Sequence, residues 1–239
     1  MEPFQFKQFS IQQDQCAMKV GTDGVLLGAW AKVNNNPRNI LDVGSGTGLI
    51  ALMLAQRSNA IEIDAIELDP NAHEQCVENF EASPWGDRLF CYHAEFTEFV
   101  AEMYEEDMTY DVIVSNPPFY IEQVSSGNSQ RDTARLNMSL PFEDLIEGAS
   151  LLLSENGIFN LVIPHKEEDK ILSIAKEFNL FPFEILHVKG SLETEIKRSF
   201  IAFSFKHSNL KKSSLSIEIT RHQYTKDYIE LTQDFYLKM

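Results

Sequence analysis

The chain alternates short apolar runs with longer segments whose apolar residues recur every three to four positions. The apolar runs, each bounded by turn residues, predict buried strands over 38–44, 61–68, 88–94, 110–116, 157–164, 183–190 and 199–206. The helical periodicity predicts helices over 49–57, 70–82, 96–106, 141–153 and 171–180. This rhythm predicts an α/β fold with a mostly parallel seven-stranded sheet and helices on both faces. No helix is predicted between the last two strands, so the last strand is expected to be antiparallel.

Three regions follow from this pattern. Residues 37–208 form the α/β core, residues 1–36 are an N-terminal extension, and residues 209–239 are a C-terminal extension that is expected to pack on the core. Within the core, the polar stretch 125–139 is long for a loop of a compact domain, which suggests a functional loop.

Composition narrows the class of protein. The 239 residues carry 20 Lys and Arg against 36 Asp and Glu, and 44% are hydrophobic, which excludes wholesale disorder. Three scattered cysteines argue against a disulfide framework and a structural zinc site. The six histidines show no metal-ligand spacing, so surface or packing roles and no bound metal are expected. No secretory signal or apolar run of about 18 residues is present, which favours a cytoplasmic protein without a membrane partner.

The charge is distributed unevenly along the chain. The formal net charge is −16, which is unfavourable for contact with nucleic acid. Residues 1–164 hold 8 basic and 25 acidic residues, or −17, whereas residues 165–239 hold 12 and 11, or +1. A basic face on an acidic body, or simply a charge-rich solvated surface, would each fit this asymmetry.

A glycine-rich turn follows the first core strand. Asp42, Gly44, Gly46 and Gly48 lie between that strand and the next helix, where α/β folds bind nucleotide-type ligands. Glycines allow a ligand to approach the backbone closely. The GxGxG spacing after an aspartate differs from the GxGxxG of dinucleotide-binding enzymes, whose helix N-terminus holds a pyrophosphate.

Acidic residues follow the next two strands. Glu67 lies 19 residues after Gly48, near the offset at which a carboxylate accepts ribose hydroxyls, and Asp69 is the competing candidate. Glu95 follows the third strand, where a ligand's base would lie, although a solvated carboxylate would fit that position equally well.

Two consecutive prolines follow the fourth strand, in the sequence Asn116-Pro117-Pro118-Phe119. They fix the backbone and remove two N–H donors, so the side-chain oxygen of Asn116 and the carbonyl of Pro117 can each accept a bond from an exocyclic amine. Phe119 would stack on a planar ring, a contact worth roughly 1–3 kcal/mol per base. The motif therefore predicts recognition of a planar amine.

With these motifs the sequence resembles class I S-adenosylmethionine-dependent methyltransferases of the N6-adenine type, which have a Rossmann-like fold. More narrowly, it is similar to the bacterial tRNA1(Val) adenine-N6-methyltransferase family. The narrower resemblance rests on residues 6–30 (FKQFSIQQDQCAMKVGTDGVLLGAW), on the NPPF motif, and on residues 228–239 (YIELTQDFYLKM).

The resemblance implies methylation of the exocyclic N6 of adenosine 37 in valine tRNA, with S-adenosylhomocysteine as the second product. The cofactor-binding residues it implies are Lys19, Thr22, Asp42, Gly44, Gly46, Gly48, Glu67, Leu68 and Glu95. The glycine turn would line the methionine side, Glu67 would bind the ribose, and the N-terminal extension would close the pocket. Residues 116–119 would hold the target base.

The tRNA partner requires basic residues. The candidates from the polar loop and the C-terminal extension are Arg131, Arg135, Lys211, Lys212, Arg221 and Lys226. The enzyme is expected to be a monomer.

Three alternatives stay open. An rRNA guanine-N2 methyltransferase shares NPPF but usually has a second methyltransferase-like domain. A protein-glutamine methyltransferase uses a similar motif but would carry a helical substrate domain ahead of the glycine turn. A non-catalytic RNA-binding module could retain the pocket without turnover.

Overall fold

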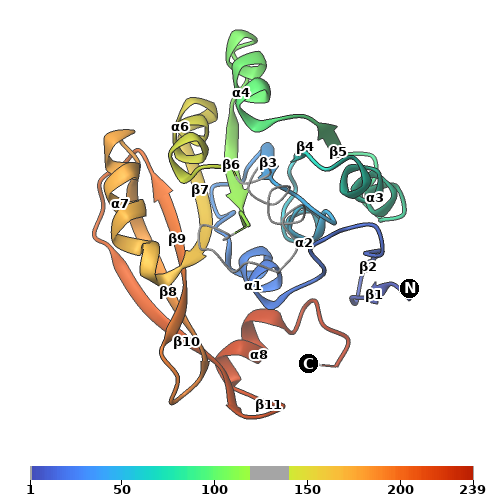
Figure 1. Cartoon of the computed structure of the whole chain (residues 1–239), viewed down its shortest axis with the longest axis vertical. Coiled ribbons are helices and arrows are strands. Elements are labelled where there is room, and N and C mark those ends of the chain that lie inside the picture. Colours follow the sequence, from blue (N-terminus) through green and yellow to red (C-terminus); the bar gives the residue numbers. More distant parts are fainter. Residues whose placement is uncertain (1, 119–139, 239) are drawn as a thin grey trace, which may run out of the picture.

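The structure is a computed structural model that describes residues 2–118 and 140–238. A mostly parallel sheet runs through it in the order β11-β10-β8-β9-β7-β6-β3-β4-β5 (Figure 1). Its strands are β3 (Asn39–Val43), β4 (Glu62–Glu67), β5 (Leu89–His93), β6 (Tyr110–Ser115), β7 (Leu153–Pro164), β8 (Phe181–Ser191), β9 (Ile196–Ser204), β10 (Lys211–Thr220) and β11 (Gln223–Tyr224). β9 is antiparallel to both of its neighbours, β7 and β8, as expected from the short connection between the last two core strands.

Helices cover both faces of the sheet. One apolar core lies under α1 (Thr22–Trp30), α2 (Leu49–Arg57), α3 (Pro70–Glu81) and α8 (Lys226–Thr232). The second lies under α4 (Phe96–Glu105), α6 (Phe142–Leu152) and α7 (Glu168–Glu177), which follows the short 3-10 helix η1 (His165–Glu167). Continuously buried strands such as β3 and β6 fit a parallel sheet that is covered on both sides. Within the described residues, no helix is long and apolar enough to cross a membrane.

All seven strands and five helices expected for the core are present, and the C-terminal extension adds two strands. β10 pairs in parallel with β8, and β11 pairs with the end of β10, which extends the sheet to nine strands. Apolar and polar residues alternate over 215–220 of β10, although Leu215 is the only buried residue of the strand and its first four residues are polar and exposed. The C-terminal extension is therefore part of the sheet as well as a cover over one face.

The N-terminal extension contains a helix that the periodicity does not reveal. Seven consecutive residues of α1 are buried, and the helix holds two glycines, which normally disfavour helices. Packing explains one of them, because a Cβ on Gly28 would lie 2.6 Å from the Met53 sulfur of α2. The glycine thus permits close approach of α1 and α2.

The rest of this extension runs over α3 and meets the other end of the chain. Two short strands, β1 (Phe4–Gln5) and β2 (Ser10–Ile11), pair with each other, and Phe6 forms a bridge with Tyr236. The two termini accordingly lie close together on the helical face that carries α1 and α8 (Figure 1).

Candidate active site

The carboxyl ends of β3, β4 and β6 meet at one edge of the sheet. Val43 at the end of β3 pairs with Ile66 on one side and with Ser115 on the other. The Ser115 hydroxyl donates a 2.9 Å hydrogen bond to the Val43 carbonyl, which fixes the end of β6 against β3. The glycine turn, Glu67 and the Asn-Pro-Pro segment are therefore brought together, as their positions after successive strands predict.

The three glycines of the turn differ in their surroundings. Gly44, Gly46 and Gly48 all have positive φ angles, of 74°, 55° and 78°. A Cβ on Gly44 or Gly46 would meet no atom within 4 Å, so this part of the turn faces open space. A Cβ on Gly48 would lie 2.5 Å from the Phe80 ring and 2.8 Å from the Cys76 sulfur. Gly44 and Gly46 thus leave room for a ligand, whereas Gly48 allows the turn to pack on α3.

Asp42 connects the start of the glycine turn to α2 through a hydrogen bond. Its side chain is fully buried, and Oδ2 accepts a 3.1 Å hydrogen bond from the Ala51 amide of α2. Oδ1 is also buried, and it has no hydrogen-bond donor among the described residues. Burial raises the pKa of Asp42 to about 7, against the opposing effect of the Ala51 hydrogen bond. The carboxyl group therefore shapes the turn rather than facing solvent.

The structure separates the two acidic candidates after β4. Glu67 is half-buried, and its Oε2 accepts a 2.8 Å hydrogen bond from the Gly46 amide. Its Oε1 accepts a 2.8 Å bond from the amide of Asp69. Asp69 instead caps α3, where Oδ1 accepts bonds from the amides of Asn71 and Ala72. Glu67 is the acid at the glycine turn, and Leu68 beside it is 41% exposed.

Glu95, which is predicted to contact the base of a ligand, also caps a helix. Its Oε2 accepts hydrogen bonds from the Thr97 and Glu98 amides, at 2.9 and 3.1 Å, and therefore caps α4. The Thr97 hydroxyl donates to the same oxygen. Any contact with a ligand base would have to share this carboxylate with the helix cap.

The Asn-Pro-Pro segment lies beside the start of α1. Asn116 and Pro118 are half-buried and Pro117 is buried. A Cβ built on Gly24 would lie 3.8 Å from the Asn116 amide nitrogen and 3.2 Å from Leu49 at the start of α2. The N-terminal extension therefore reaches the motif directly. Phe119, Arg131 and Arg135 lie outside the described residues.

Two buried amide side chains hold the N-terminal extension on α3. Asn79 accepts a 2.8 Å hydrogen bond from the Gln12 amide and donates to the carbonyls of Gln12 and Thr47, both at 2.9 Å. Gln75 accepts from the Gln15 amide at 3.0 Å and donates to Asp14 at 2.9 Å. Their helical periodicity is visible in the sequence, but their partners, 32 to 67 residues away, are not.

Lys19 and Thr22 follow this tethered segment. Both are exposed, and Thr22 is the first residue of α1. Asp23 forms a 2.7 Å ion pair with the Arg198 guanidinium of β9, which ties the start of α1 to the sheet. The local sequence around Arg198 does not reveal this ion pair, because 175 residues separate Arg198 from its partner. The N-terminal extension thus lies next to the site, with Lys19 exposed just before α1 and Thr22 exposed at its first position.

The basic residues of the C-terminal extension do not form one patch. Lys211 starts β10 and Arg221 follows its end, so roughly 30 Å of strand separates them. Lys212 forms a 3.4 Å ion pair with Glu168, and Lys226 forms a 3.3 Å pair with Glu230 on the same helix. Arg221 lies at the sheet edge that carries the site, whereas Lys211 lies at the opposite edge.

The sequence of this chain is similar to those of known methyltransferases. Residues 24–181 match the family model described as methyltransferase small domain. A protein from Flavobacterium psychrophilum is 59% identical over 99% of this chain and its own full length, and one from Christiangramia forsetii is 60% identical over 100% of this chain and 99% of its own. Both carry the name tRNA1(Val) (adenine(37)-N6)-methyltransferase.

Solved structures show the same fold at much lower identity. A predicted O-methyltransferase from Agrobacterium tumefaciens has a TM-score of 0.68 at 18% sequence identity. The match covers 89% of this chain and 96% of that one. At this identity the likeness supports the methyltransferase fold alone.

Proposed function

The chain belongs to the tRNA1(Val) (adenine(37)-N6)-methyltransferase family, and on that premise we propose that it methylates the exocyclic N6 of adenosine 37 in valine tRNA. S-adenosylmethionine is the methyl donor, and S-adenosylhomocysteine is the second product. The observation that carries this proposal is the position of Asn116-Pro117-Pro118 at the end of β6, beside the open glycine turn that follows the neighbouring strand β3.

The described residues fit an S-adenosyl ligand. The open space over Gly44 and Gly46 admits a ligand close to the backbone. Glu67 lies at the same turn with each carboxylate oxygen bound to one backbone amide, and a carboxylate oxygen has capacity for a second donor such as a ribose hydroxyl. Asp42 and Gly48 support the turn, Leu68 and Glu95 would border the adenine, and Lys19 and Thr22 would close the amino-acid end.

The target amine is oriented by the Asn-Pro-Pro segment. The side-chain oxygen of Asn116 and the carbonyl of Pro117 accept its two N–H bonds, which leaves the nitrogen lone pair free, and Phe119 stacks on the base. The bound cofactor would supply an electrophilic methyl group on a sulfonium. The amine nitrogen that Asn116 and Pro117 orient would take up this methyl group, the sulfonium would leave as a neutral thioether, and the amine proton would pass afterwards to water. Acceptors placed where N6 gains positive charge stabilise the transition state.

The RNA must approach an acidic protein. The target base leaves its stack at a cost of a few kcal/mol, which is lower in an open anticodon loop than in a duplex. We place phosphate contacts at Arg131, Arg135 and Arg221, and weaker long-range attraction at Lys211, Lys212 and Lys226. Binding should then weaken steeply as the salt concentration rises. The methyl transfer itself uses no metal ion in this proposal, and the enzyme acts as a cytoplasmic monomer.

The test is methyl transfer from labelled S-adenosylmethionine into tRNA, rRNA and protein in parallel, with nucleoside analysis of the product. We expect N6-methyladenosine confined to valine tRNA, and a loss of at least about 100-fold in rate for Asn116→Ala, comparable to removing a transition-state hydrogen bond. Asn209→Ala is the matched control, because Asn209 is exposed near the far end of the sheet. Label only in rRNA guanine or in protein would contradict the substrate, and cofactor binding without any transfer would favour a binding module.

A further inference from the structure

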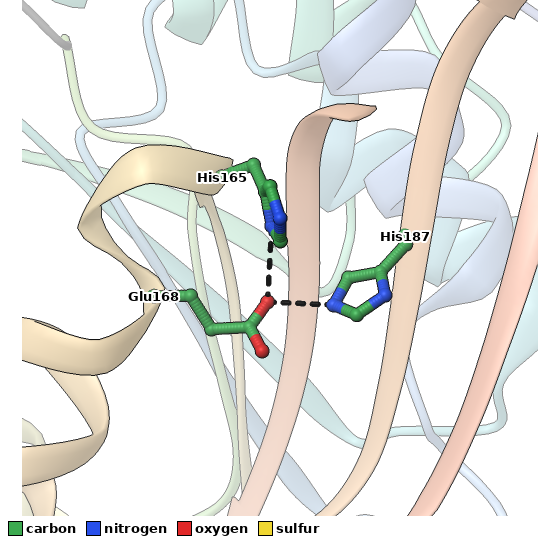
Figure 2. Close-up of side chains that lie close together, drawn as sticks. All are labelled: His165, Glu168 and His187. Atoms are coloured by element: carbon green, nitrogen blue, oxygen red, sulfur yellow. Dashed lines mark hydrogen bonds and ion pairs between the residues drawn. The ribbon is translucent and has the colours of Figure 1, made fainter. Parts of the chain in front are cut away.

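Two histidines and a glutamate from three elements converge in a cluster that shares no residue with the candidate active site. His165 lies in η1, directly after β7, Glu168 is the first residue of α7, and His187 lies in β8. Figure 2 shows one nitrogen of each imidazole pointing at the same carboxylate oxygen of Glu168. The distances to this oxygen, Oε2, are 2.7 Å from His187 Nε2 and 3.3 Å from His165 Nδ1.

This cluster is built into the fold rather than spread over the surface. The Glu168 side chain is 8% exposed and that of His187 is 16% exposed, whereas that of His165 is 36% exposed and leaves a path from solvent. Ser199 of β9, which is fully buried, donates a 2.5 Å hydrogen bond to Oε2. Its oxygen also lies 2.9 Å from His165 Nδ1. The Ser199 hydroxyl and one nitrogen of each imidazole therefore surround one carboxylate oxygen.

We propose that His165, Glu168 and His187 bind one divalent transition-metal ion of the zinc class, through Nδ1, Oε2 and Nε2 respectively. One candidate ligand atom from each residue lies within 4.8 Å of the other two. Metal–ligand bonds of 2.0–2.2 Å in a tetrahedral site separate the ligand atoms by roughly 3.3–3.5 Å, so small side-chain shifts suffice. Two imidazoles and one carboxylate are a ligand set that zinc uses, and a water would take the fourth position.

Such an ion would replace hydrogen bonds with a cross-link. It would take the place of the donors on His165 and His187, and the Ser199 hydroxyl would still orient the carboxylate as an outer-shell partner. The cross-link would join the end of β7, the start of α7 and the middle of β8. The histidine spacing in the sequence gives no sign of it, because the fold brings His187 back beside residues about 20 positions earlier.

Lys212 provides a competing cation. Its ammonium group lies 3.4 Å from Oε1 of Glu168, and its side chain is 51% exposed. A divalent ion on Oε2 would repel this ammonium group, which has room to turn toward solvent. Removing the lysine charge should therefore tighten metal binding if the cluster is a metal site.

The experiment uses the full chain, treated with a chelator, desalted and titrated with Zn²⁺ against a chromophoric chelator, with Co²⁺ as a spectroscopic probe. We expect one equivalent of Zn²⁺ and visible Co²⁺ absorption bands typical of low coordination. His187→Gln should weaken binding at least about 100-fold, more than the 10–100-fold expected for losing an outer-shell partner. His207→Gln is the matched control, because this exposed histidine stacks on Phe181 away from the cluster.

Two further variants keep the proposal open to refutation if His187→Gln does not fold. Ser199→Ala retains all three ligands and should lose no more than the 10–100-fold in Zn²⁺ affinity expected for an outer-shell partner, whereas Lys212→Gln should bind Zn²⁺ more tightly. No stoichiometric Zn²⁺ on the wild-type chain, equal binding by His187→Gln, or unchanged or weaker binding by Lys212→Gln would each overturn the metal site. The cluster would then be a hydrogen-bonded network only.

Discussion

Buried carboxyl groups in the two halves of the sheet have pKa values that are shifted in opposite directions. In the half that holds the glycine turn, Asp42 and Asp64 are buried, and one oxygen of each has no donor among the described residues. Burial accordingly raises their pKa values, to about 7 and about 6. In the other half, burial also acts to raise the pKa of Glu168. The hydrogen bonds from Ser199 and His187, with the nearby charges of His187 and Lys212, outweigh burial and lower it.

This difference in pKa shifts accompanies a difference in the surroundings of the carboxyl groups. Around the turn, open space over two glycines and the remaining acceptor capacity of the Glu67 carboxylate suit an external ligand. Around Glu168, polar atoms from five elements bind one another. Similar burial therefore accompanies an open site for an organic ligand in one half and a closed cluster of mutually bonded side chains, the proposed metal site, in the other.

The largest effect is expected within the glycine turn. Gly48→Ala should destabilise the protein by roughly 2–5 kcal/mol, because a left-handed residue costs about 1–2 kcal/mol and overpacking against Phe80 and Cys76 adds about 1–3. Gly44→Ala is the control, with the same left-handed φ but open space, and should cost only the conformational part. Urea unfolding of both variants measures this, and equal losses would show that the packing of Gly48 is unimportant.

The second largest effect is expected in the pH dependence of the free energy of unfolding, through Asp64. Its buried carboxyl group accepts a 2.7 Å hydrogen bond from Tyr110, yet burial raises its pKa to about 6. The folded state then binds the proton of the Asp64 carboxyl group more tightly than the unfolded chain does. The resulting contribution to the free energy of unfolding is present in full below about pH 4 and is lost as the pH rises through 6. The change amounts to about 3 kcal/mol.

Asp64→Asn removes this titration and keeps an acceptor for Tyr110. The free energy of unfolding, measured by urea titration between pH 4 and 7, should therefore fall less with pH in the variant than in the wild type. Parallel pH profiles for the two proteins would contradict a raised pKa at Asp64.

Glu67 should matter for cofactor affinity, and Asp69 should not. Replacing the carboxylate with an amide in Glu67→Gln weakens hydrogen bonds to a charged acceptor, worth about 1.5–3 kcal/mol, or roughly 10–150-fold in Kd for S-adenosylhomocysteine. Asp69→Asn alters only the cap of α3 and should leave the Kd within about 3-fold. Calorimetric titration separates the two acids, and a larger effect at Asp69 would reverse their assignment.

The smallest effect is expected at Ser199. Ser199→Ala removes one of the hydrogen bonds that hold Glu168 and should cost about 1–3 kcal/mol of stability. Methyl transfer should stay within about 2-fold of wild type, because this network lies apart from the glycine turn. A large loss of activity with unchanged stability would place Ser199 in the active site instead.

The parts of the site that follow strand ends could be predicted from the sequence. The glycine turn, Glu67 and Asn116 are short local signals, and a parallel sheet brings the ends of β3, β4 and β6 to one edge. The capping role of Glu95 was less visible, because a carboxylate before a helix suits both a cap and a ligand.

Other features depend on contacts between distant residues. The α1 helix was hidden by its glycines, whose value lies in close packing on α2. The alternation over 215–220 is compatible with strand β10, but its parallel pairing with β8 is known only from the fold. The Glu168 network joins residues from η1, α7, β8, β9 and β10, and no local spacing reveals such a set.

The most direct test of the central claim compares two valine tRNA transcripts that differ at one position, with adenosine or guanosine at 37, as substrates for labelled S-adenosylmethionine. The account predicts label in N6-methyladenosine on the first transcript and none on the second. Label in N2-methylguanosine on the second transcript, or equal label on both, would contradict it.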